Sequence, residues 1–308
     1  MQEQELRDAV RTGDIKKLRT LCEQGAIEAV EADWPDARSY FMVSAIKSTM
    51  DFTGGAPKLH ATGHTEIVAH LLQLGANVNY VEETDPPGQD RGPLHWAATY
   101  GDRDIAALLI QHGADVNAKW EPTGDTPLGM AIHSYEDDDH PLDEATEKRL
   151  FDTMQLLVNK GADVNARNNT QEYPDNIGET VLFRTYNPKL IKYLVDKGAD
   201  VNARNNMGWT PLHGLARYMS DTRAAEALIE CGADVNAVDK SGKTPLDLAL
   251  SNDRARNDQM KELLQSYQTP MPMPTFTSPP PNPAKSGGCM GVLALVVVTA
   301  AVCLALIH

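Results

Sequence analysis

The stretch GADVNARNNMGWTPLHGLARYMSDTRAAEALIECGADVN, residues 198–236, decides the fold. It begins and ends with one phrase, Gly-Ala-(Asp/Asn)-Val-Asn, which starts at Gly75, Gly113, Gly161, Gly198 and Gly232. The successive intervals are 38, 48, 37 and 34 residues, and each copy follows a leucine-rich segment such as LVDKGADVNA. Self-similarity at such a period indicates a chain built from stacked repeats.

A second phrase recurs between these copies: GPLHWAA from Gly92, DTPLGMAI from Asp125, WTPLHGLA from Trp209 and KTPLDLAL from Lys243. Thr210 is suited to cap a helix whose first position is Pro211, where a missing N–H costs nothing. A second helix is expected from Ala224 to Cys231, ended by Gly232 in the left-handed conformation. Each unit is therefore predicted to be helix, helix and projecting loop.

These two phrases in fixed order resemble the ankyrin-repeat family, and the resemblance covers roughly residues 4–267. It implies an all-α ankyrin-repeat solenoid over residues 1–268, with about seven units whose first and last are degenerate caps. We expect a degenerate first unit in Leu6–Ala26 and a last one in Lys243–Tyr267. Segments that depart from the period, HSYEDDDHPLDEATEKRL above all, are expected to be surface insertions.

The tail differs in composition. Residues 269–289 are rich in proline and are predicted to be an extended linker. Residues 290–307, MGVLALVVVTAAVCLALI, carry no charge and are predicted to form one transmembrane helix. With no apolar signal segment at the N-terminus, this predicts a single-pass tail anchor with the repeats in the cytoplasm. A processed sorting or lipid-anchor signal is the alternative.

Composition and motifs narrow the function classes. The 308 residues have a formal net charge of −15, which argues against a nucleic-acid partner. No nucleophile, phosphate-binding or zinc motif is found, so we expect no enzyme and no cofactor. A metal-dependent enzyme built on the acidic run Asp137–His140 is a remote alternative, because an exposed acidic loop is usually only solvated.

The ankyrin resemblance implies that a protein partner binds at loop tips and along the first helices. The residues that match those places are Arg91, Thr99, Tyr100, Trp120, Asp125, His133, Asn206, Met207, Trp209, Arg217 and Tyr218. The alternative for Trp120 and Trp209 is packing against neighbouring loops. Trp96 is expected in the core, and the resemblance implies that His95 and His213 link neighbouring loops.

The leading hypothesis is a non-catalytic, membrane-tethered adaptor or scaffold that recruits or sequesters a cytosolic protein. The alternative, in another class, is a regulatory or inhibitory subunit that occludes an enzyme.

Overall fold

The computed structural model describes residues 2–48, 50–51, 58–59, 63–81, 91–135, 143–169, 177–219, 222–251 and 258–268. All of them belong to one compact unit, Met1–Thr269. The predicted proline-rich linker, residues 269–289, and the predicted transmembrane helix, residues 290–307, lie outside the described residues. Within the described ranges, no helix has both the length and the apolar character needed to cross a bilayer.

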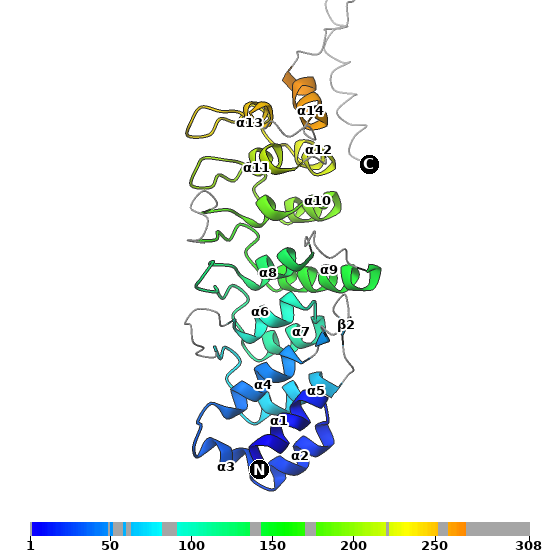
Figure 1. Ribbon diagram of the computed structural model, residues 1–308, viewed down its shortest axis with the longest axis vertical. Helices are drawn as coiled ribbons and strands as arrows, with labels where there is room; N and C mark the ends of the chain where they lie inside the picture. The colour runs from blue at the N-terminus through cyan, green and yellow to red at the C-terminus, as the bar shows by residue number, and fades with distance from the viewer. Residues whose placement is uncertain are drawn as a thin grey trace, which may run out of the picture. The chain divides into compact units, whose positions relative to one another are not determined.

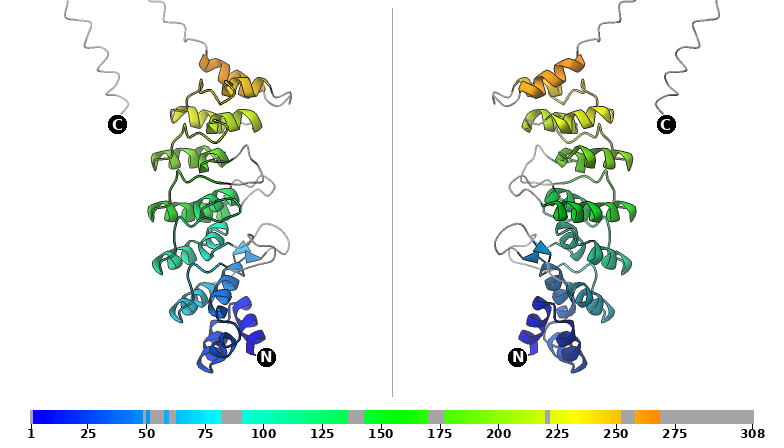
Figure 2. Two further views of the ribbon diagram at one scale, coloured as in Figure 1. Left: turned by 90° about the vertical axis from the view of Figure 1, so that its left-hand side faces the viewer. Right: turned by 90° about the vertical axis from the view of Figure 1, so that its right-hand side faces the viewer.

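Helix pairs follow one another along the compact unit in two rows (Figures 1 and 2). The row of first helices is α1 (Gln2–Thr12), α4 (Ala37–Lys47), α6 (Pro93–Thr99), α8 (Pro127–Tyr135), the 3-10 turn η2 (Val181–Arg184), α11 (Pro211–Tyr218) and α13 (Pro245–Leu250). The row of second helices is α2 (Ile15–Glu23), α5 (Gly63–Gln73), α7 (Arg103–Gln111), α9 (Glu144–Asn159), α10 (Pro188–Asp196), α12 (Arg223–Glu230) and α14 (Asp258–Gln268). Each first helix contacts the next first helix along the row.

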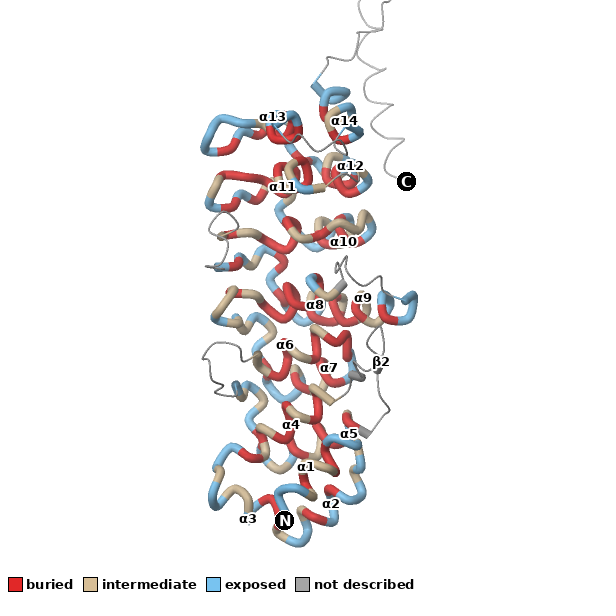
Figure 3. The backbone as a smooth tube through the Cα atoms, in the orientation of Figure 1, coloured by how far each residue is buried: buried red, intermediate tan, exposed pale blue. Residues whose placement is uncertain are grey.

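The core runs between the two rows and continues from pair to pair (Figure 3). Leucine and alanine fill most of it, for example Leu94, Ala97 and Ala98 of α6 against Leu128 of α8, because small and medium side chains let helices approach closely. A single pair could bury only one stripe of these residues, so the free energy of folding depends on stacking.

Glycine ends the second helices as the sequence predicts. The five glycines of the first repeated phrase have φ between +90° and +95°, a left-handed conformation that disfavours other residues. Aspartate caps the second helix in some units: Asp102 Oδ1, for example, accepts a hydrogen bond of 3.0 Å from the N–H of Ile105.

Asparagines of the same phrase connect the second helix of one unit to that of the next. Asn165 accepts from the N–H of Asp200 at 2.8 Å and donates to the carbonyl of Gly198 at 2.9 Å. Asn202 repeats the pattern with Asp234 and Gly232 at 2.8 and 3.1 Å. Each asparagine satisfies backbone groups of the following unit, which fixes the register between units.

Three places differ from a uniform stack. Residues between α4 and α5 include a short antiparallel pair, β1 (Met50–Asp51) and β2 (Lys58–Leu59), so the all-α expectation is wrong for these four residues, where an insertion interrupts the second unit. The loop after α2 contains an additional helix, α3 (Ala26–Glu31). Part of the predicted acidic insertion, Glu144–Leu150, is not loop but the first turns of α9.

Candidate protein-binding surface

We call the loops that join one unit to the next the fingers; they project from the row of first helices (Figure 1). In the finger before α11, Asn205 Oδ1 accepts from the N–H groups of Met207 and Trp209 at 2.9 and 3.0 Å. In the finger before α13, Asp239 Oδ1 accepts from those of Ser241 and Lys243 at 2.7 and 2.9 Å. A short polar side chain at this position therefore closes the finger on itself.

Backbone hydrogen bonds also join neighbouring fingers. The N–H of Asn206 donates to the carbonyl of Ile177 at 2.9 Å, and that of Lys240 to the carbonyl of Met207 at 3.0 Å. Arginines bridge the same gaps, since Arg204 Nη1 donates to the carbonyl of Val238 at 2.6 Å. The fingers are thus held in position before any partner arrives, which lowers the entropy lost on binding.

Histidines of the second repeated phrase tie fingers to helices, as the resemblance implied. His213 Nδ1 accepts from the N–H of Thr210 at 3.1 Å, so the proton is on Nε2, which lies 3.1 Å from the carbonyl of Lys243. His95 Nε2 lies 3.0 Å from the carbonyl of Ala118. Burial, the largest cause, lowers the pKa of both imidazoles. Both are therefore neutral structural groups at neutral pH.

The predicted residues of the sixth unit divide into enclosed and exposed members. Trp209 is 9% exposed, and its indole Nε1 donates to Asp239 Oδ2 at 3.0 Å, which is the alternative role of packing against a neighbouring finger. Tyr218 lies next to it, with ring centroids 6.1 Å apart, and is 57% exposed. Met207 packs beside Trp209, whereas Asn206 is exposed and Arg217 half-buried. Tyr218 is therefore the aromatic side chain of this pair that is accessible to a partner.

The predicted residues of the third unit lie around Trp96, which is half-buried and packs against the core. The guanidinium carbon of Arg91 lies 5.2 Å from the ring centroid of Trp96 and 4.5 Å from that of Trp120. Tyr100 is 7% exposed with its ring centroid 5.7 Å from that of Trp96. Thr99 donates its hydroxyl to the carbonyl of His95 at 2.8 Å. Arg91, Trp96 and Trp120 therefore form one cluster across two units.

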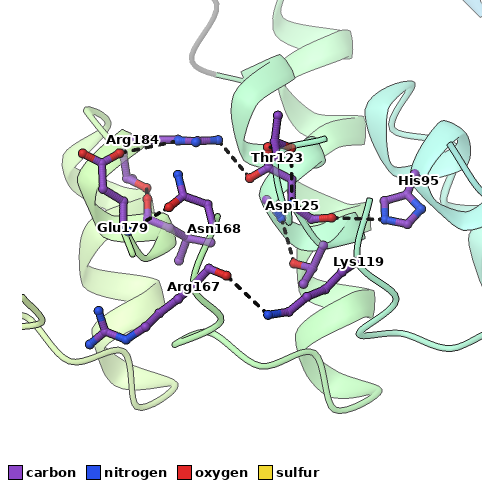
Figure 4. A network of polar contacts seen from close by, with 12 residues as sticks. His95, Lys119, Thr123, Asp125, Arg167, Asn168, Glu179 and Arg184 are labelled. Carbon is purple, nitrogen blue, oxygen red and sulfur yellow. Dashed lines mark hydrogen bonds and ion pairs between the residues drawn. The ribbon is translucent and has the colours of Figure 1, made fainter. Parts of the chain in front are cut away.

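Asp125, two residues before α8, belongs to a polar network with Thr123, Arg184 and Glu179 (Figure 4). Its carboxylate accepts from Arg184 Nη1 at 2.9 Å and from the hydroxyl of Thr123 at 2.6 Å. Arg184 also lies 3.9 Å from Glu179, and a cavity of about 20 Å³, room for one water, is lined by all three ionic groups. Burial raises the pKa of Glu179 to about 7, against the opposing influence of Arg184. His133, at the end of α8, is exposed.

Three residues beside these side chains were not predicted from the sequence: Lys47, Glu179 and Arg184. Lys47 ends α4, in a unit that lacks the second repeated phrase, so nothing in the sequence aligns it with Trp96. Its ammonium lies 5.1 Å from the Trp96 ring centroid. Glu179 occupies the same repeat position as Arg91 and Trp209, directly before the capping residue, and that alignment was the available signal.

A metal-binding site would need several ligand side chains close together. Across the described ranges, no group of three or more His, Cys, Asp or Glu side chains is arranged to hold a metal ion. Asp137–His140, the acidic run considered for a cation, lies outside the described residues.

Comparison with known proteins agrees with this architecture. The family profile described as "Ankyrin repeats (3 copies)" matches residues 6–120, 58–168 and 180–271. The mouse and human proteins named "Ankyrin repeat and SOCS box protein 6" are each 32% identical over 109 residues, 35% of this chain and 22% of theirs. The opossum (Monodelphis domestica) "Cyclin-dependent kinase inhibitor 2A" is 29% identical over 119 residues, 39% of this chain and 58% of its own.

The matched segment thus spans less than two thirds of each of these relatives. The family match covers well over half of the chain, and its repeats coincide with the helix pairs, fingers and asparagine bridges described above. The ankyrin repeat is a protein–protein interaction module, and the chain belongs to the ankyrin-repeat family.

Proposed function

We propose that this chain is a non-catalytic adaptor that binds a partner protein along its fingers and first helices. The observation that carries the proposal is Tyr218, which is 57% exposed at the end of α11 although its neighbour Trp209 is enclosed. Tyrosine is enriched among residues that dominate binding energy, because it buries a large rigid area and keeps a polar group.

The surface around Tyr218 supports this proposal in two further ways. Arg217 and Asn206 lie on the same unit and offer polar groups at the rim. The fingers on either side are fixed by the bonds from Asn206 to Ile177 and from Lys240 to Met207. A rigid surface with one exposed aromatic side chain and a polar rim is typical of protein interfaces.

A regulatory or inhibitory subunit is the second candidate. It is favoured by the relative named cyclin-dependent kinase inhibitor, which is 29% identical over 119 residues. In this case the partner would be an enzyme, and the same surface would cover its active site. The relatives named for ankyrin repeats and a SOCS box are compatible with either candidate.

Tethering to a membrane is a separate part of the proposal and rests on sequence alone. The uncharged run of residues 290–307 has the length of a short bilayer-spanning helix, and the proline-rich residues 269–289 would hold the repeats away from the membrane. The repeats would face the cytoplasm, and the anchor would raise the local concentration of a recruited partner.

The binding proposal is tested by affinity capture with the full chain, followed by quantitative mass spectrometry. Tyr218→Ala is compared with Tyr267→Ala, a matched control because Tyr267 is 49% exposed but ends α14 in the row of second helices. We expect the captured partner to fall at least about tenfold with Tyr218→Ala and to be unchanged with Tyr267→Ala. Equal capture by both variants contradicts the proposal.

The two candidate functions are separated on the captured complex. If the partner is an enzyme and its activity falls in proportion to bound wild-type chain but not to Tyr218→Ala chain, the inhibitory role holds. If activity is unchanged while the partner is co-localised with the chain, the adaptor role holds.

The tether is tested by alkaline carbonate extraction of membranes from cells that make the full chain. We expect the chain to remain in the pellet and a variant that ends at residue 289 to move to the supernatant. Extraction of the full chain by carbonate contradicts a spanning helix.

A further inference from the structure

Arg91 is held between two indole rings at the boundary of the third and fourth units. Its guanidinium carbon lies 5.2 Å from the centroid of Trp96 and 4.5 Å from that of Trp120. With the other residues of the described ranges, the Arg91 side chain makes no hydrogen bond or ion pair. Stacking uses the faces of the guanidinium and leaves its in-plane N–H donors available to a ligand.

Electrostatic compensation of Arg91 by the protein is incomplete. Burial lowers its pKa, and the nearby Tyr100 and Asp125 oppose that effect only in part. Asp125 is a carboxylate whose charge acts on Arg91, but it accepts from Arg184 at 2.9 Å and from Thr123 at 2.6 Å. Among the described residues no carboxylate pairs with Arg91, which leaves its in-plane donors for a carboxylate of another molecule.

Trp120 breaks the rule that the later fingers follow. Where Asn168, Asn205 and Asp239 use a side-chain oxygen to accept backbone N–H groups, Trp120 offers none. In this finger the N–H of Trp120 donates to the carbonyl of Asp125 at 2.9 Å, and Thr123 Oγ1, not the side chain at position 120, accepts the N–H of Asp125 at 3.3 Å. The indole Nε1 is buried and has no hydrogen-bond partner among the residues that the structure describes. A local rule broken at a cost in stability is typical of functional positions.

A second cation lies on the same ring system. The ammonium of Lys47 is 5.1 Å from the centroid of Trp96, on the ring that also faces Arg91. Two cations and two indoles thus gather on the inner surface of a chain whose formal net charge is −15. These two cations favour an acidic partner over a basic one.

We propose that Arg91, clamped by Trp96 and Trp120 and assisted by Lys47, is the anchor for an acidic segment of the partner protein. A carboxylate of that segment pairs with the in-plane donors of Arg91 in bidentate geometry, and an adjacent aromatic side chain packs on the exposed part of Trp96. This deepens the proposed function, on which it rests, by naming the chemistry of the partner.

The proposal is tested with a defined probe, a fluorescein-labelled copolymer of glutamate and tyrosine, titrated with the full chain and followed by fluorescence anisotropy. Arg91→Gln removes the charge from the clamp. Arg103→Gln is the matched control, because Arg103 makes the same charge change from an exposed position on α7, in the row of second helices. Melting curves verify that both variants are folded.

We expect the wild-type chain to bind the copolymer and to lose affinity as the salt concentration is raised from about 50 to about 300 mM, because salt screens the attraction between charges. Arg91→Gln is expected to weaken binding by about tenfold to a hundredfold and Arg103→Gln by less than about twofold. Trp120→Asn, which installs the residue type of the later fingers, is expected to weaken binding several-fold and serves if Arg91→Gln does not fold.

No binding by the wild-type chain, or equal affinities for Arg91→Gln and Arg103→Gln, overturns the proposal. Binding only after the copolymer is phosphorylated on tyrosine also overturns it, because the anion would then be phosphate. These outcomes are independent of the Tyr218 test: a captured partner lost in Tyr218→Ala but retained in Arg91→Gln leaves the adaptor function standing and removes the acidic anchor alone.

Discussion

The third and sixth units carry the same Pro-Leu-His phrase but complete its polar groups differently. In the sixth, Thr210 precedes the phrase and pairs with His213, and Trp209 pairs with Asp239 of the next finger. In the third, Gly92 replaces the threonine, and within the described part of the chain neither His95 Nδ1 nor Trp120 Nε1, both buried, has a hydrogen-bond partner. The same fold thus tolerates one finger whose tryptophan and histidine are hydrogen-bonded and another, the incomplete finger, in which the tryptophan Nε1 and the histidine Nδ1 have no such partner among the described residues. The incomplete finger is the candidate for binding a ligand.

The largest expected effect separates the two tryptophans. Trp209→Ala removes a buried indole and its hydrogen bond to Asp239 Oδ2, so we expect the free energy of unfolding to fall by about 3 to 4 kcal/mol. Trp120→Ala removes a half-buried ring whose N–H donates no hydrogen bond to the described residues, and we expect a loss below about 1.5 kcal/mol. Urea unfolding followed by circular dichroism measures both, and similar losses would contradict the contrast.

This result also bears on how binding is tested. Since Trp209 holds a finger, a variant at this position would lose a partner through unfolding as well as through lost contact. Tyr218 is the informative neighbour, because its exposed ring can be removed with a change in stability within about 0.5 kcal/mol.

Glu179 occupies, in the fifth unit, the repeat position of Arg91 and Trp209. Its ionisation gives the next largest expected effect on stability. Its pKa is raised by burial from 4.5 to about 7, so the folded state binds more protons than the unfolded state between these values. Stability therefore falls as pH rises from about 4.5 to about 7, by at most about 3 kcal/mol, and is level above. We expect Glu179→Gln to be more stable than wild type at pH 7.5 by about 1 kcal/mol or more.

Unfolding measured at pH 5.0, 6.0 and 7.5 checks this prediction. The wild-type chain and Glu179→Gln should approach each other at the lowest pH, where both side chains are neutral in the folded state. A difference that does not depend on pH would mean that Glu179 is ionised throughout, paired with Arg184.

The smallest effect comes from closing the incomplete finger. Gly92 has an extended conformation, with φ of −63° and ψ of 162°, that threonine adopts without strain. A Cβ there would lie 3.5 Å from His95 Nδ1, and in the sixth unit the Thr210 hydroxyl lies 2.9 Å from His213 Nδ1. We expect Gly92→Thr to raise the free energy of unfolding by about 1 kcal/mol.

The reverse change, Thr210→Gly, is the companion measurement and should lower stability by about the same amount. If Gly92→Thr is neutral or destabilising while Thr210→Gly is destabilising, the two fingers differ in backbone and not only in their capping residue.

Sequence reasoning predicted the architecture well because the repeat encodes it locally. Proline at the first helical position and glycine at +90° to +95° are each dictated by a few neighbouring residues, and each is present in the structure. The positions of the insertions were predicted, but their secondary structure was not. The segment between α4 and α5 contains β1 and β2, and Glu144–Leu150 forms the first turns of α9. Repeat phrases carry no information about residues that lie outside the period.

For this protein, the sequence by itself determined the stacked helix pairs, since two phrases in fixed order leave no other way to bury the apolar stripes. Only the tertiary structure decided which predicted side chains are available. Trp209 is enclosed and Tyr218 exposed, although they are nine residues apart in one unit. Lys47 lies over Trp96, and Arg91 lies over Trp120, because stacking brings side chains of three consecutive units together. Contacts across units depend on the stacking register, which no single repeat encodes.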